Sequence, residues 1–307
     1  MSSQSVAFLG LGNMGLPMAL NIAKAGFQVT LWNRSVEKAE AAQKEAAAEG
    51  LSVTVAESLE AAVDGKHFII TMVANDEALE NVLKAMLSHC KKGAIHLSMS
   101  TISPSCAKAC AAKCAEFAVR YLASPVFGRP EHAKAKQLSI PVTGDERAFE
   151  ESKPLLESLG HRVTYFGETL HGANAVKLCG NFLLLTMIES WSEALALGEA
   201  NGLDREKLTE FLSGSLFPCP VVQNYSRMIA ARDHFPAGFV ARLGLKDASL
   251  IHALGAESEV PLPMASLLKD RIQTMLNSCM DNLDWSALGL LASRDAGVDI
   301  QKWLHKS

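Results

Sequence analysis

A glycine-rich turn near the start of the chain constrains its fold more than any other feature. Gly10, Gly12 and Gly15 follow the apolar run Val6–Leu9 and precede an apolar stretch of helical character. In this context the spacing G-x-G-x-x-G is typical of a dinucleotide-binding turn between a strand and a helix. The first glycine permits the turn, the second lets the backbone approach a pyrophosphate, and the third lets the helix pack closely. The first N–H groups of the helix then face the phosphates.

The end of the predicted second strand indicates which dinucleotide binds. NAD-binding domains usually carry Asp or Glu about 20 residues after the glycine turn, where it bonds the ribose 2′-hydroxyl. Here Trp32 is followed by Asn33, Arg34 and Ser35, without a carboxylate. A guanidinium pairs well with a 2′-phosphate, and Asn33 and Ser35 carry hydrogen-bond donors. We therefore predict NADP(H) rather than NAD(H), the alternative being that Arg34 is an ordinary solvated arginine.

Bulk composition argues against several other classes of protein. The 307 residues are 49% hydrophobic and 20% charged, with a formal net charge of −4, which is ordinary for a globular enzyme. This charge predicts neither a nucleic-acid nor a membrane partner, and no apolar run reaches the ~20 residues that span a bilayer. The first strand begins by about Ser5, leaving little room for a leader segment, so we expect a cytoplasmic protein.

Cysteine usage predicts neither disulfides nor a metal site. The chain has seven cysteines, and Cys106, Cys110 and Cys114 recur every fourth residue. This spacing puts them on one face of a helix, but a metal site would need a further ligand. We expect them to serve as small apolar side chains on a buried face.

Strand-like and helix-like segments alternate over the first half of the chain. This alternation predicts an α/β fold with a doubly wound, mostly parallel sheet, the Rossmann arrangement, over residues 1–168. The predicted strands are 6–9, 28–32, 52–55, 68–73, 95–99, 120–126, 138–143 and 163–166.

The second half of the chain lacks strand signals and predicts an all-α domain over residues 169–307. A long helix over 169–200 would join the two domains. Its centre, residues 182–188, is apolar on all sides, which predicts burial on every side. Further helices are predicted at 204–212, 221–231, 239–254, 261–280 and 285–295.

Candidate site residues occur at strand ends and on the long helix. Ligands of open α/β sheets bind beyond the carboxyl ends of the strands, where the segments 72–75, 100–104 and 124–130 fall. Lys177 and Asn181 are four residues apart and therefore share one helix face. A lysine in an apolar run is costly unless it is paired or functional, and an ammonium can donate a proton to a carbonyl oxygen. The alternative is a lysine that extends to the surface.

Four motifs in order give the chain a resemblance to the β-hydroxyacid dehydrogenase family, which includes 3-hydroxyisobutyrate dehydrogenase and glyoxylate/succinic semialdehyde reductases. Residues 10–19 match G-x-G-x-M-G-x-x-M-A, and residues 99–104 match the segment beside the nicotinamide. Residues 177–181 match K-x-x-x-N, and residues 239–247 match F-x-x-x-L-x-x-K-D. The resemblance implies a small carbonyl or hydroxy-acid substrate and a homodimer or homotetramer.

The motifs and the resemblance together imply a role for each matched residue. Lys177 and Asn181 are the expected catalytic residues, and no metal is expected. The expected cofactor-binding residues are Gly10, Gly12, Asn13, Met14, Gly15, Asn33, Arg34, Ser35, Met72, Val73, Ala74, Thr101 and Lys246. The expected substrate-binding residues are Ser100, Phe127, Gly128, Arg129 and Asp247.

The substrate loop departs from the family pattern D-A-P-V-S-G-G. Residues 123–129 read A-S-P-V-F-G-R, so Phe127 replaces the serine and Arg129 the second glycine. Arg129 either binds a substrate carboxylate with two hydrogen bonds or points to solvent. A loop of this kind is similar to that of imine reductases, which share the fold.

We therefore expect an NADPH-dependent reductase of a small aldehyde or keto acid, or the reverse oxidation, with Lys177 as general acid and base. One alternative is an imine reductase. Another is a catalytically silent NADP-binding scaffold, because a fold alone does not fix function. Retention of Lys177, Asn181 and Lys246 argues against the scaffold.

Overall fold

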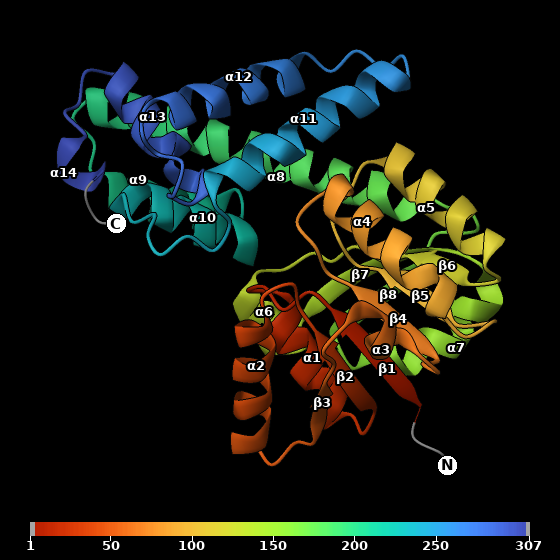
Figure 1. The fold of residues 1–307 in the computed structure, drawn as a ribbon. Helices are drawn as coiled ribbons and strands as arrows, with labels where there is room; N and C mark the ends of the chain where they lie inside the picture. Colours follow the sequence, from red (N-terminus) through yellow and green to blue (C-terminus); the bar gives the residue numbers. More distant parts are fainter. Residues whose placement is uncertain (1–3, 305–307) are drawn as a thin grey trace. The chain divides into compact units, whose positions relative to one another are not determined.

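The chain separates into two compact units, Met1–Lys177 and Leu178–Ser307, in a computed structural model that describes residues 4–304 (Figure 1). The units divide inside helix α8 (Gly172–Ala200), which begins in the first and continues through the second. The boundary predicted between residues 168 and 169 lies in the loop before this helix.

The first unit is built on an eight-stranded sheet, which confirms the predicted doubly wound α/β fold. Its strand order is β3-β2-β1-β4-β5-β6-β7-β8. All neighbouring strands run parallel except β6 and β7, which are antiparallel. The strands are β1 (Ser5–Leu9), β2 (Gln28–Trp32), β3 (Val53–Val55), β4 (Phe68–Thr71), β5 (Ile95–Ser98), β6 (Arg120–Ala123), β7 (Leu138–Gly144) and β8 (Gly160–Tyr165).

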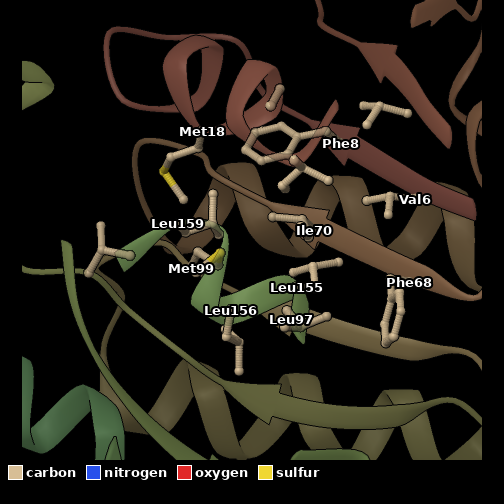
Figure 2. Close-up of a cluster of buried hydrophobic side chains, with 14 of the residues drawn as sticks. Val6, Phe8, Met18, Phe68, Ile70, Leu97, Met99, Leu155, Leu156 and Leu159 are labelled. Carbon is tan, nitrogen blue, oxygen red and sulfur yellow. The ribbon is translucent and has the colours of Figure 1, made fainter. Parts of the chain in front are cut away.

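The central strands are apolar on both faces because helices cover both sides of the sheet. Along β1, Val6 and Phe8 join one buried cluster, whereas Ala7 and Leu9 join the other. Figure 2 shows part of the first cluster, where Phe8 and Ile70 from the strands lie with Leu155 and its neighbours from α7. Successive strand side chains point to opposite faces, so a shift of one residue would exchange the two cores.

Short polar caps start several helices of the first unit. Ser103 caps α5, where its Oγ accepts from the Cys106 N–H and Pro104 takes the first helical position. Cys106, Cys110 and Cys114 are buried on the inner face of α5, as predicted. The helices are α1 (Gly15–Lys24), α2 (Val36–Ala48), α3 (Leu59–Val63), α4 (Asp76–Met86), η1 (Leu87–His89), α5 (Pro104–Glu116), α6 (Pro130–Lys134) and α7 (Glu146–Glu157).

Helices are the regular elements of the second unit in its described part, as predicted. Its core gathers around Trp285, whose Nε1 donates to Tyr225 Oη at 3.0 Å. Beyond α8 the elements are α9 (Arg205–Ser215), α10 (Pro220–Ala231), α11 (Ala241–Glu257), α12 (Pro263–Asn277), η2 (Trp285–Ala287), α13 (Leu288–Asp295) and α14 (Gln301–Leu304).

The prediction that the centre of the long helix is buried on every side is wrong for this chain. Leu185 and Ile188 are buried in the core, but Leu183 is 68% exposed. The composition of residues 182–188 is apolar all round, yet the core of the unit contacts only part of the helix circumference. Among residues 4–304 no helix combines the length and the apolar character needed to cross a membrane.

Candidate functional site

The glycine turn fits a dinucleotide pyrophosphate. Gly10 has φ +105°, and a Cβ there would lie 2.3 Å from the Met72 carbonyl oxygen. A Cβ on Gly15 would lie 2.0 Å from the Gly10 carbonyl oxygen, so the start of α1 requires glycine. Gly12, by contrast, is exposed and has open space where its side chain would be. Asn13 and Met14 complete the turn into α1. The turn therefore exposes backbone where a phosphate would sit, beside the N-terminus of a helix.

Asn33 connects this turn to the end of β2. Its Oδ1 accepts from the Leu11 N–H at 2.9 Å, and its Nδ2 donates to the Ser35 carbonyl oxygen at 3.0 Å. One side chain thus fixes both the phosphate turn and the loop that would meet the adenosine ribose. The sequence predicted a donor to the cofactor here, and the structure adds this bridging role.

An exposed cation lies in the loop after β2, and an exposed anion lies in the first turn of α2 that follows. Arg34 is exposed, whereas the Ser35 hydroxyl donates to Glu37 Oε2 at 2.6 Å. This hydrogen bond, with a contribution from the backbone, holds the pKa of Glu37 below its usual value. An ionised Glu37 therefore stands beside the segment predicted to bind a 2′-phosphate, where it would repel that group.

Two hydrogen-bonded bridges join the loops that follow β4 and β5. Ser100 is fully buried, and its Oγ accepts from the Val73 N–H at 2.8 Å. Asp76, at the start of α4, accepts from both the N–H and the hydroxyl of Ser103. Ser100 therefore fixes the predicted cofactor loop 72–74, while the neighbouring Thr101 is partly exposed.

The loop after β6, which is predicted to bind the substrate, is held against β7. The Phe127 N–H donates to the Ser139 carbonyl oxygen at 2.8 Å, and the Ser139 N–H returns a bond of 3.0 Å. Gly128 has φ +141°, and a Cβ there would lie 2.6 Å from Leu138 Cδ2. The Arg129 N–H donates to His132 Nδ1 at 3.3 Å. The loop backbone is therefore fixed at consecutive residues.

The Arg129 side chain is paired and mostly covered. Its Nε lies 3.5 Å from Glu131 Oε1, and the side chain is 15% exposed. The sequence left open whether Arg129 binds a substrate carboxylate or points to solvent. In the structure the side chain does not extend into solvent.

Lys177 and Phe127 meet at the start of α8. The Ala173 N–H donates to Thr143 Oγ1 at 3.0 Å, which anchors the first turn of α8 to β7. Because β7 also holds the substrate loop, Lys177 Nζ comes to lie 4.3 Å from the centre of the Phe127 ring. Lys177 is only 8% exposed, and Phe127 is partly exposed. This distance is within the range of a cation–π interaction.

In the second unit, Asn181 is held by a buried carboxylate. Its Nδ2 donates to Asp247 Oδ2 at 2.6 Å, and the two residues are 3% and 1% exposed. The other carboxylate oxygen of Asp247 lies 3.1 Å from Lys246 Nζ. Asp247 is thus placed to orient Asn181. Since an amide nitrogen carries two protons, one remains for another acceptor.

Sequence reasoning missed one polar residue near Lys177. Asn174 lies one turn earlier on α8 and is 1% exposed, and neither amide atom has a hydrogen-bond partner among the described residues. Its spacing of three residues from Lys177 was the available signal. Within residues 4–304 no group of three His, Cys, Asp or Glu side chains is arranged to hold a metal ion.

Two protein-family models together match almost the whole chain. Residues 5–167 match the NAD binding domain of 6-phosphogluconate dehydrogenase. Residues 172–303 match the model described as NAD-binding of NADP-dependent 3-hydroxyisobutyrate dehydrogenase. With the glycine turn and helical second unit, these matches define a nicotinamide-dependent oxidoreductase.

Individual relatives of this chain are also oxidoreductases. An uncharacterized oxidoreductase of Bacillus subtilis, YfjR, is 37% identical, over 92% of this chain and 98% of its own. The NAD-dependent L-serine dehydrogenase of Pseudomonas aeruginosa is 32% identical, over 93% of this chain and 96% of its own. The structure of Mycobacterium tuberculosis 3-hydroxyisobutyrate dehydrogenase with L-serine superposes with a TM-score of 0.83 at 28% identity. The match covers 94% of this chain and 99% of that one. The chain belongs to the β-hydroxyacid dehydrogenase family.

Proposed function

We propose that this oxidoreductase uses NADP(H) to reduce a small aldehyde or keto acid to the hydroxy acid, or catalyses the reverse oxidation, with Lys177 as general acid and base. The observation that carries the proposal is the buried ammonium of Lys177 beside the substrate loop. Burying a charged group is costly, and a positioned proton donor is a function that repays the cost.

The proposed chemistry divides simply between cofactor and protein. A bound nicotinamide would supply hydride to the carbonyl carbon. Lys177 Nζ would donate a proton to the carbonyl oxygen during reduction and take it back during oxidation. The second Nδ2 proton of Asn181, held in place by Asp247, would orient the same oxygen.

The cofactor preference is supported by the loop after β2. Arg34 is the exposed cation that would pair with a 2′-phosphate. Gly10, Gly12, Asn13, Met14 and Gly15 would hold the pyrophosphate. Residues 72–74 and Thr101 would line the nicotinamide half, and Lys246 would add a further contact.

Phe127 supports a second candidate, imine reduction, because it brings the loop closer to the pattern of imine reductases. The two candidates differ in the substrates that they predict, because an imine reductase would turn over cyclic imines and no aldehydes.

Steady-state consumption of NADPH and NADH over a panel of small semialdehydes, 2-oxo acids and cyclic imines tests these proposals. Lys177→Ala should lower carbonyl turnover by roughly 10²–10⁴, the usual effect of removing a positioned acid. Lys113→Ala removes an exposed lysine and is the matched control. Turnover near the wild-type rate in Lys177→Ala would refute the assigned role, and turnover of imines alone would favour the second candidate. Cofactor binding with no turnover would indicate a scaffold.

A further inference from the structure

Two of the backbone N–H groups that could bind a carboxylate at the substrate loop are already bonded within the protein. The Phe127 N–H is bonded to the Ser139 carbonyl oxygen, and the Arg129 N–H is bonded to His132 Nδ1. At position 127 the family pattern has a serine hydroxyl, whereas this chain has a hydrocarbon ring. A carboxylate placed here would lose water without gaining these hydrogen bonds, which is costly.

The nearby cations already lie beside groups of the protein. The Arg129 guanidinium faces the Glu131 carboxylate, with 3.5 Å between Nε and Oε1. Lys177 Nζ lies 4.3 Å from the Phe127 ring centre, and its proton is needed at the reacting oxygen. A substrate carboxylate that paired with Lys177 would hold the ammonium away from that oxygen.

The backbone that carries the Phe127 ring is fixed in place. The paired bonds between Phe127 and Ser139 fix its backbone, and Gly128 follows in a conformation that other residues rarely adopt. The ring therefore stands on a fixed backbone as an apolar wall next to Lys177. Fixed walls of this kind discriminate between substrates because they need no rearrangement on binding.

We propose that Phe127 determines the substrate class of this site. The preferred substrate is an aldehyde or ketone with a neutral, apolar carbon chain next to the substrate loop, and a compound whose chain ends in a carboxylate is disfavoured. The inference rests on the proposed function and deepens it: of the small carbonyl compounds proposed there, it favours those with an apolar chain, whose reduction gives a neutral alcohol rather than a hydroxy acid. Phe127 acts both on the substrate, as a wall, and on Lys177, as the ring that positions the ammonium.

A pair of matched substrates tests this inference. Succinic semialdehyde and its methyl ester carry the same aldehyde and the same carbon chain, and differ in the charge at the far end. With NADPH as reductant, the wild-type protein should show kcat/KM at least about tenfold higher for the ester, the scale of discrimination that an apolar pocket provides. Phe127→Ser restores a hydroxyl and should lower the ester-to-acid ratio by about tenfold, mainly through KM. Phe127→Tyr keeps the ring and should retain the preference.

The outcomes separate the two proposals. Turnover that requires Lys177 but shows the acid preferred, or the same ratio in the wild type and Phe127→Ser, would overturn the role of Phe127 and leave the proposed function intact. Absence of turnover for both compounds and for the whole carbonyl panel would overturn both. Circular dichroism and thermal unfolding of each variant show whether Phe127→Ser is folded. Phe127→Leu is a second variant, which removes the aromatic ring but keeps an apolar side chain. In this variant the ester preference should persist with a lower kcat.

Discussion

Acid is expected to destabilise the first unit through His96, a residue outside the candidate site. His96 lies on β5 with no exposed surface, its Nε2 is 2.9 Å from Thr71 Oγ1, and its Nδ1 is 3.7 Å from Cys114 Sγ. Burial lowers its pKa from 6.5 to about 3. The folded protein therefore keeps the ring neutral at pH values where the unfolded chain binds a proton.

The sign and size of the effect follow from the difference between these two pKa values. Because the folded pKa lies below the unfolded one, the stability contributed by the neutral ring is complete above pH 6.5 and is lost as the pH falls toward 3. A pH of 5 is about 1.5 units below the pKa of this histidine in the unfolded chain, where the ring is protonated, whereas the ring in the folded protein is still neutral. At 1.36 kcal/mol per unit, the free energy of unfolding should fall by about 2 kcal/mol between pH 7.5 and pH 5 from this residue alone.

Urea unfolding of the wild type and of His96→Gln at both pH values isolates this contribution. Glutamine is similar in size, keeps a polar group toward Thr71 and does not titrate. His234 in the second unit, whose pKa burial also lowers to about 3, is present in both proteins, as are the carboxylates, so their effects cancel. The wild type should lose about 2 kcal/mol more than the variant. An equal loss in the two proteins would refute the reasoning.

Three further substitutions test other features of the structure. Glu37→Gln should improve KM for NADPH relative to NADH by about threefold at low salt, because it removes an exposed negative charge near the predicted 2′-phosphate site; the same gain in Glu40→Gln would show that the effect is not local. Ser100→Ala should raise KM for the cofactor by about tenfold, since it leaves the Val73 N–H without its partner; an unchanged KM would mean that the loop 72–74 does not depend on this bond. Asn174→Leu should raise Tm by about 2–4 °C in thermal unfolding, because it removes a buried amide without partners among the described residues; a fall in Tm would show that the amide is satisfied in solution.

The Rossmann fold could be predicted from the sequence because its signals are local. Glycines at fixed spacing after an apolar strand, together with alternating strand and helix patterns, identify the glycine turn and all eight strands. The antiparallel pairing of β6 and β7 has no such local signal, because strand direction depends on which edge a strand joins. The exposure of Leu183 was missed for a related reason: composition shows that a helix is apolar, but the packed core decides which side is covered.

The candidate site shows the same division between sequence and tertiary structure. The sequence alone provided the residue types: a lysine and an asparagine one helical turn apart, an arginine after β2, and a phenylalanine where the family has serine. Only the tertiary structure placed Lys177 against the Phe127 ring, 50 positions earlier in the chain, and Asp247 against Asn181, 66 positions apart. It also showed that Asn33 and Ser100 brace neighbouring loops. Residue type and short-range spacing are encoded locally, whereas hydrogen-bond partners across a fold depend on how strands and helices pack together, and that packing decided which of these side chains meet.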